Sequence, residues 1–331
     1  MYEAFYGLKE RPFELVPNPR FLFLTPRQRE ALSNLRYGLT TARGLTLLIG
    51  EAGTGKTTLV QAAVADPSAA AVRIVLMSNP TLTRSEFYEF LARAFSLSEE
   101  ASESKTRFLF ELRRELQERY KAEVLSALII DEAQSLPYEL LEEVRLLSNI
   151  ETTTNKLLNV ILAGQPELSD RLNDTSLRQL KQRISLRCQL KPMELNETAS
   201  YIAGRIRIAG GRPEQVFTRE AVAAVFHVSG GLPRTVNVIC DNALIGGFAS
   251  QVRPINAAFV DDVCRDFDLL TPGGSVAAAP SLSDQDPIAH ERPAIAAPLV
   301  PSSTTGAAPA AESSVTPIFS NINRKRKFSF F

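Results

Sequence analysis

The stretch Gly50-Glu51-Ala52-Gly53-Thr54-Gly55-Lys56-Thr57-Thr58 decides the fold of this chain of 331 residues. It fits the pattern G-x4-G-K-[ST], in which glycines let backbone N–H groups turn inward on a phosphate without a Cβ clash. The run 45–49 before it predicts a buried strand, and the residues after it predict a helix whose positive N-terminus faces the same anion. A merely structural glycine-rich turn has no need of this strand–loop–helix context. We therefore expect all nine residues to form a phosphate-binding loop for a nucleoside triphosphate.

Two further positions complete the expected chemistry. Lys56 can reach the β- and γ-phosphates, and the Thr57 hydroxyl can take a position on Mg²⁺. A second apolar run, 125–130, ends in Asp131-Glu132. At the carboxyl edge of a sheet, Asp131 can hold Mg²⁺ or its water, and Glu132 can orient the attacking water. Without the upstream loop, two solvated acids at a strand end would be the simpler interpretation; with it, we expect a Mg²⁺-dependent ATPase that converts ATP and water to ADP and phosphate.

Arginines are the candidates for neutralising charge on the γ-phosphate, and they can come from a neighbouring subunit. Arg178 and Arg183 stand in the basic stretch 176–184, just before the last predicted strand. Arg234 follows Ser229-Gly-Gly-Leu-Pro at a predicted helix start, from where it could swing over the phosphates when two domains close. The alternative for the stretch 176–184 is a solvated basic helix face.

Composition narrows the class of protein. Apolar residues make up 44% of the chain, and Lys+Arg and Asp+Glu balance at 37 each, which disfavours one large nucleic-acid groove. Three separated cysteines, at 188, 240 and 264, have no metal-ligand spacing and are expected to be small apolar residues in a reducing compartment. No signal peptide and no apolar run long enough to span a bilayer is visible. We expect a soluble, cytoplasmic protein.

The chain divides into five expected segments. Residues 1–26, rich in aromatics and prolines, predict an extended segment pinned across the core, where Tyr2, Phe5 and Phe13 either stack on adenine or, as an alternative, pack internally. Residues 27–191 alternate strands and helices, which predicts a mostly parallel sheet covered on both faces. Residues 192–268 carry only helical signals, with Asn196 and Thr218 as N-caps and Pro233 in a first turn. An Ala/Pro/Ser-rich disordered linker, 269–323, precedes a basic and aromatic terminal peptide, 324–331.

Together these residues resemble an AAA+ ATPase, and more narrowly the ExeA/GspA secretion-pathway type with its relatives in exopolysaccharide–exosortase systems. The resemblance covers residues 1–268. Its motifs are Met1-Tyr-Glu-x-Phe-Tyr-Gly-Leu, Pro12-Phe13, Pro17-Asn-Pro, the phosphate-binding loop, Asp131-Glu-Ala-Gln134, Leu147-Ser-Asn-Ile-Glu-Thr152, Gly164-Gln-Pro-Glu-Leu168 and Gln182-Arg-Ile184.

The resemblance implies a P-loop NTPase fold: a three-layer αβα core with a parallel sheet of order 5-1-4-3-2, a small all-α lid, and assembly into a ring or partial ring. It makes Lys56 and Thr57 the Walker A pair and Asp131 and Glu132 the Walker B pair. Gln165 then takes the sensor 1 place, although many AAA+ proteins have Asn, Ser or Thr there. Arg183 becomes the arginine finger, with Arg178 as the fallback, and Arg234 becomes sensor 2.

Three functions remain open at this stage. The first is an ATPase that supports assembly of an envelope secretion or exopolysaccharide-export system. The second is a DNA-binding ATPase of the transposition-helper or origin-recognition kind, and the third is a nucleotide-gated adaptor that hardly hydrolyses. Larger secretion-type members continue into a membrane anchor and a peptidoglycan-binding domain, whereas this sequence stops shortly after Arg324-Lys-Arg-Lys327. That basic and aromatic end predicts weak peripheral attachment to an anionic membrane, or else a solvated terminus.

Overall fold

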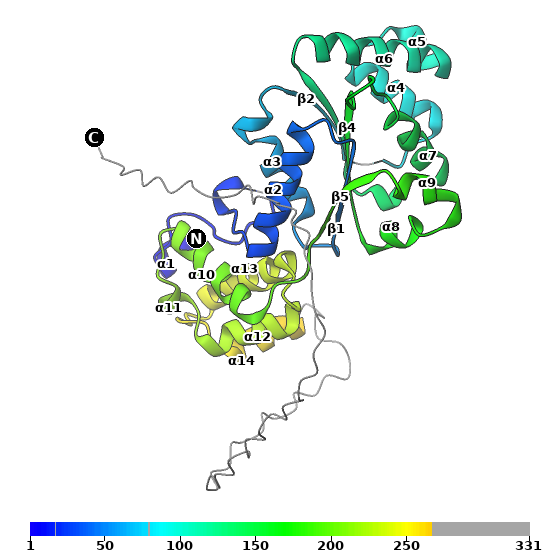
Figure 1. Cartoon of the computed structure of the whole chain (residues 1–331). Coiled ribbons are helices and arrows are strands. Elements are labelled where there is room, and N and C mark those ends of the chain that lie inside the picture. The colour runs from blue at the N-terminus through cyan, green and yellow to red at the C-terminus, as the bar shows by residue number, and fades with distance from the viewer. Residues whose placement is uncertain (17, 79, 267–331) are drawn as a thin grey trace, which may run out of the picture. The chain divides into compact units, whose positions relative to one another are not determined.

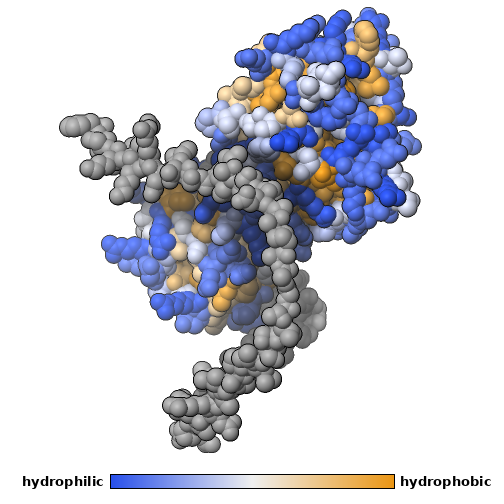
Figure 2. All heavy atoms as spheres, viewed as in Figure 1, coloured by the Kyte–Doolittle hydropathy of each residue, from blue (hydrophilic) through white to orange (hydrophobic). Residues whose placement is uncertain are grey.

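The computed structural model describes residues 1–16, 18–78 and 80–266, all of which fall in one compact unit, Met1–Ser275 (Figure 1). The linker predicted for residues 269–323 and the terminal peptide 324–331 lie outside the described residues. Most of the face seen in Figure 2 is hydrophilic, with apolar residues in small separate areas. Within the described part of the chain, no helix combines the length and apolarity needed to cross a membrane.

Five parallel strands form one sheet in the order β2-β3-β4-β1-β5, which is the predicted order 5-1-4-3-2 read from the other edge. Their bounds are β1 Leu45–Ile49, β2 Val72–Met77, β3 Leu125–Ile130, β4 Leu158–Gly164 and β5 Ile184–Gln189. The three central strands are almost wholly buried, as expected for strands covered on both faces. Their carboxyl ends therefore meet at one edge of the sheet.

Helices cover both faces of this sheet, so the predicted three-layer αβα core is confirmed (Figure 1). Alternate residues of β1, β3 and β4 enter two separate apolar clusters. One cluster packs under α4 Arg84–Ala94, α6 Lys105–Lys121 and α7 Tyr138–Leu147, and the other under α2 Pro26–Thr40 and α3 Lys56–Val64. Three shorter helices complete the domain: α5 Glu99–Glu103, α8 Pro166–Arg171 and α9 Arg178–Lys181.

A small helical domain follows β5, as predicted. It consists of α10 Leu195–Ile208, α11 Pro213–Val216, α12 Arg219–Ser229, α13 Pro233–Ala249 and α14 Ala257–Asp266. Thr218 caps α12 and Pro233 opens α13, as expected. The prediction of Asn196 as the N-cap of α10 was wrong: Glu194 caps the helix, because its side chain and that of Glu197 form a reciprocal capping box.

The N-terminal segment differs from its prediction in two ways. Residues 1–26 are not extended throughout, because Tyr2–Tyr6 form the short helix α1, which ends at Gly7 in the left-handed conformation, and Pro19–Phe21 form a 3₁₀ turn. The segment also packs against the helical domain instead of crossing the sheet domain. Phe13 is fully buried there, with its ring edge-on to Phe217 at 6.3 Å.

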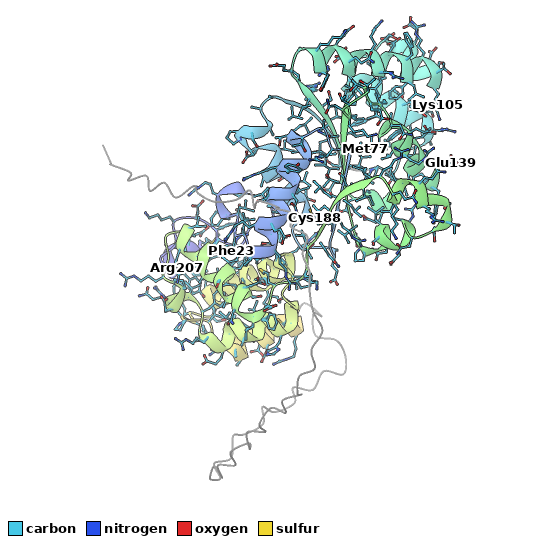
Figure 3. All side chains as sticks on the ribbon, in the orientation of Figure 1. Phe23, Met77, Lys105, Glu139, Cys188 and Arg207 are labelled. Atoms are coloured by element: carbon cyan, nitrogen blue, oxygen red, sulfur yellow. The ribbon has the colours of Figure 1, made fainter. Side chains whose placement is uncertain are left out.

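The burial of the N-terminal aromatics decides between their two interpretations. Tyr2 and Phe13 lie in the apolar cluster of the helical domain, and the ring of Phe5 packs on that of Phe248 at 5.7 Å. Phe23, labelled in Figure 3, contacts Tyr201 of α10 edge-on at 5.9 Å. Internal packing is therefore the correct interpretation of Tyr2, Phe5 and Phe13. The helices α10–α14 are called the lid below, and the N-terminal segment packs against them.

Candidate nucleotide-binding site

The loop 50–58 joins β1 to α3 at the carboxyl edge of the sheet. The N–H of Gly50 donates to the carbonyl of Gly164 at the end of β4, at 3.1 Å, which fixes the loop beside its neighbouring strand. Gly53 and Gly55 have positive φ angles of 80° and 94°, and α3 begins directly after Gly55. The first turn of any helix leaves N–H groups without intrahelical acceptors, so this loop presents donors to an anion.

Lys56 is held inside the loop. Its side chain is only 5% exposed, and its Nζ donates to the carbonyls of Gly50 and Glu51 at 2.8 and 3.1 Å. Burial lowers the pKa of the Lys56 ammonium, and the nearby carboxylates of Glu132 and Asp131 oppose that shift. The ammonium is thus positioned next to the space that the loop encloses, and a phosphate would compensate its burial better than two neutral carbonyls do.

Thr57 and Asp131, which the sequence assigns to Mg²⁺, contact each other directly. The Thr57 hydroxyl donates to Oδ2 of Asp131 at 2.6 Å, and Oδ1 of Asp131 accepts from the N–H of Glu132 at 2.9 Å. Asp131 is buried, and its N–H donates to the carbonyl of Met77 at the end of β2. No group of three or more His, Cys, Asp or Glu that could hold a metal occurs in the described residues. One hydroxyl and one carboxylate still fit Mg²⁺, which keeps several waters and takes phosphate oxygens as ligands.

Glu132 has a constrained backbone at the point where chemistry is expected. Its φ of 54° and ψ of 37° are unusual for a residue with a Cβ, and such strain concentrates at functional sites. Its Oε2 accepts from Nε2 of Gln134 at 2.5 Å and from Nε2 of Gln165 at 3.4 Å. Gln165 therefore reaches the carboxylate only through a long hydrogen bond. Sequence reasoning assigned no role to Gln134, although the quoted motif Asp131-Glu-Ala-Gln134 contains it.

A cavity of about 350 Å³ lies over the loop and is lined from three directions. The first set of residues comes from the loop and its helix, including Gly53 to Thr58, and Glu132 lies beside them. The second comes from the N-terminal segment and the start of α2, and the third from the lid: Tyr201, Arg205, Pro233, Arg234 and Asn237. Gly50, Glu51 and Ala52 of the predicted loop do not line this cavity. Its volume is within the range of small-ligand pockets.

Arg234 stands where the lid meets the loop. Its N–H donates to the carbonyl of Gly53 at 3.2 Å, and a Cβ on Gly53 would approach the Arg234 Cβ to 3.0 Å, so the close approach depends on this glycine. Arg183 and Arg178, by contrast, do not line the cavity. Arg178 begins α9 and is exposed, and Arg183 follows that helix, where its Nε is buried without a partner among the described residues.

Comparison with known proteins gives the class to which this fold and site belong. The model of the AAA domain family matches residues 39–172, which contain the loop, Asp131, Glu132 and Gln165. The general secretion pathway protein A of Aeromonas hydrophila is 40% identical over 251 residues, covering 75% of this chain and 45% of that protein. The chain therefore spans less than half the length of this relative.

Solved structures agree on the fold. The Aeropyrum pernix ORC2 protein, determined as ADPNP–ADP complexes, superposes with a TM-score of 0.58 at 17% identity, covering 78% of this chain and 72% of that one. The Drosophila ORC bound to DNA superposes with a TM-score of 0.58 at 19% identity, covering 78% and 65%. The protein is an AAA+ P-loop protein, a nucleotide-binding class. Within that class it belongs to the ExeA/GspA type.

Proposed function

We propose that this protein binds ATP together with Mg²⁺ and hydrolyses it to ADP and phosphate, and that turnover supports assembly of an envelope secretion or exopolysaccharide-export system. The observation that carries the hydrolytic part is the contact of Thr57 with Asp131 at 2.6 Å beside a buried Lys56, with Glu132 as the next residue. The name of the 40%-identical relative, a general secretion pathway protein, supports the second part.

Each residue has a separate task in this proposal. Gly50 to Thr58 are assigned to the phosphates, with Lys56 placed to neutralise them and Thr57 and Asp131 placed to hold Mg²⁺. Bound Mg²⁺ would supply charge neutralisation at the phosphate oxygens. Glu132 is the carboxylate that orients the water and accepts its proton, and Arg234 bridges lid and loop.

Arg183 is proposed to act in trans. Because neither it nor Arg178 lines the cavity of its own chain, a finger role requires a second copy of the chain in a ring or partial ring. Specific activity should then rise steeply with protein concentration. Constant specific activity across the assembly range would remove Arg183 from the mechanism without affecting the Walker residues.

The first experiment measures ATP turnover with Mg²⁺ for the wild type beside Lys56→Ala and Glu132→Gln. We expect Lys56→Ala to lose nucleotide binding, and Glu132→Gln to bind ATP but turn it over at least about 100-fold more slowly, the typical contribution of a positioned base. The Gln variant also separates a motor from an adaptor, because an adaptor would keep its partner interactions when hydrolysis stops. Absence of turnover in the wild type at any protein concentration would refute hydrolysis.

A DNA-binding ATPase is the second candidate. The fold is shared with ORC proteins, one of which was solved bound to DNA, and this is the reason to test DNA binding. The equal numbers of basic and acidic residues weigh against a DNA-binding function. Turnover measured with and without double-stranded DNA at moderate salt separates the two functions. Strong stimulation that falls with salt would indicate DNA, whereas turnover indifferent to DNA would favour the secretion or export function.

Location and membrane contact complete the proposal. We place the protein in the cytoplasm, peripheral to the inner membrane, with the peptide 324–331 as the membrane-binding element, since basic residues beside aromatics favour an anionic interface by about 1 kcal/mol per charge. The test is co-sedimentation with anionic vesicles before and after deletion of residues 320–331. Equal co-sedimentation of both forms would refute the assignment.

A further inference from the structure

Gln134 occupies a place in the site that the Walker and sensor assignments leave without a function. It lies at the middle of the 3₁₀ turn η3, Ala133–Ser135, two residues after Glu132. Its Nε2 donates to Oε2 of Glu132 at 2.5 Å, much closer than the 3.4 Å contact of Gln165. The shortest side-chain contact of the proposed base is therefore with Gln134.

The orientation of the Gln134 amide is fixed by its other partner. Its Oε1 accepts from the backbone N–H of Gln165 at 3.0 Å, and a backbone N–H can only donate. The oxygen of the amide must consequently face β4, and the NH₂ must face Glu132. A flipped amide would lose both hydrogen bonds at once, so the side chain presents a donor to the carboxylate and nothing else.

The surroundings hold this geometry from two further directions. The carbonyl of Gln134 accepts from Nη1 of Arg171 at 2.6 Å, which ties the turn to α8. Gly164, at the end of β4, leaves the space that the amide occupies, because a Cβ there would lie 3.0 Å from Oε1 of Gln134. The turn is thus anchored through its main chain and its side chain, as expected where the left-handed backbone of Glu132 has to be maintained.

From this geometry we infer that Gln134 is a positioning residue, which fixes one oxygen of the Glu132 carboxylate so that the other is directed to the water. The inference rests on the proposed ATP hydrolysis and deepens it. Oε2 of Glu132 accepts from both glutamine amides, which leaves Oε1 as the oxygen available to accept a proton from water. Fixing the base in this way keeps it in the productive geometry, where a displacement of about 1 Å can cost about 100-fold in rate.

The test compares two replacements of Gln134: one removes its whole amide, and the other exchanges the amide for a carboxylate, which also adds a negative charge beside Glu132. Gln134→Ala removes both hydrogen bonds, whereas Gln134→Glu keeps the length of the side chain and an acceptor for the N–H of Gln165 but offers Glu132 no N–H donor. We expect both variants to lower kcat by about 10- to 100-fold while the KM for ATP and the affinity for a fluorescent ATP analogue change less than about twofold. Ser135→Ala, an exposed position on the same turn, is the matched control and should keep wild-type kcat.

Each outcome has a distinct meaning. A Gln134→Glu variant with kcat within about twofold of wild type would show that side-chain length and packing suffice, and would overturn the inference. A rise in KM at unchanged kcat would overturn it as well, because it would place Gln134 in nucleotide binding. If the wild type itself does not turn over ATP, the proposed function fails first. Thermal unfolding of each variant, compared with Ser135→Ala, separates lost positioning from lost folding.

Discussion

Replacing Phe13 by alanine tests whether the N-terminal segment belongs to the lid. Phe13 is fully buried in the apolar cluster of the helical domain, although about 200 residues separate it along the chain from its ring partner Phe217. The variant removes a fully buried ring from that cluster. The N-terminal segment would then lose one of its buried contacts with the helices α10–α14.

The magnitude follows from the buried area and the contact geometry. A phenyl ring buries on the order of 150–250 Å², which at about 25 cal/mol per Å² corresponds to roughly 4–6 kcal/mol of transfer free energy. Measured Phe→Ala changes in cores cost about 3–5 kcal/mol, since the site partly collapses. A small domain has about 5–15 kcal/mol in total, so we expect the lid to become marginally stable. The sheet domain should keep its stability, because Phe13 has no place in its two clusters.

Hydrogen exchange read by mass spectrometry resolves the two domains. We expect the slowest amides of α10–α14 to exchange about 150- to 4,000-fold faster in Phe13→Ala, the ratio that corresponds to 3–5 kcal/mol, and those of β1, β3 and β4 to change little. The matched control is Phe110→Ala, which makes the same deletion at a side chain 71% exposed on α6. Equal acceleration in both domains, or less than about tenfold in the lid, would refute the assignment of the segment to the lid.

Three further predictions concern other contacts. Thr57→Val removes the hydroxyl that donates to Asp131. We expect ATP turnover in the presence of Mg²⁺ to fall at least about 100-fold while the fold is unchanged. A dependence of turnover on Mg²⁺ concentration equal to that of the wild type would contradict this. Arg205→Lys should lower the free energy of unfolding of the lid by about 1.5–3 kcal/mol, as measured in urea. The guanidinium of Arg205 donates both to the carbonyl of Pro12, at 2.5 Å, and to the hydroxyl of Tyr201, and an ammonium cannot replace it. An unchanged midpoint of urea unfolding would refute this prediction. Hydrogen bonds from Ser98, and to a smaller extent from Arg107, lower the pKa of Glu111 from 4.5 to about 2. The ionised carboxylate of Glu111 therefore stabilises the fold above pH 4.5, and this contribution is lost as the pH falls toward 2. Glu111→Gln should therefore flatten acid unfolding in that window, as followed by circular dichroism, and an unaltered acid profile would count against the effect.

The sequence predicted the sheet domain well because its elements are local patterns. The bounds of β1 and β3 agree with the apolar runs 45–49 and 125–130 that predicted them. The contact between Thr57 and Asp131 was also predictable, because the end of one parallel strand and the loop after another share an edge of the sheet. All three cysteines are buried, as their spacing and composition indicated.

Predictions failed where the partner of a residue is distant in sequence. The aromatics of the N-terminal segment carry no signal that says which domain they pack against, so the sequence could not assign Phe13 and Tyr2 to the helical domain. Glu194 was missed as the cap of α10, because capping depends on the backbone angles at that residue, which a nearby asparagine does not reveal.

The sequence by itself determined that this protein has a phosphate-binding loop, a carboxylate pair and an alternating α/β core, since glycine positions, charges and hydrophobic periodicity are local properties of the chain. Only the tertiary structure decided which amide contacts the proposed base. Gln134 and Gln165 are equivalent in chemistry, and their contacts with Glu132, at 2.5 and 3.4 Å, depend on how η3 packs against the end of β4. Likewise, only the folded chain shows that the N-terminal segment and the lid pack together and line one cavity, because that contact joins residues from opposite ends of the described sequence.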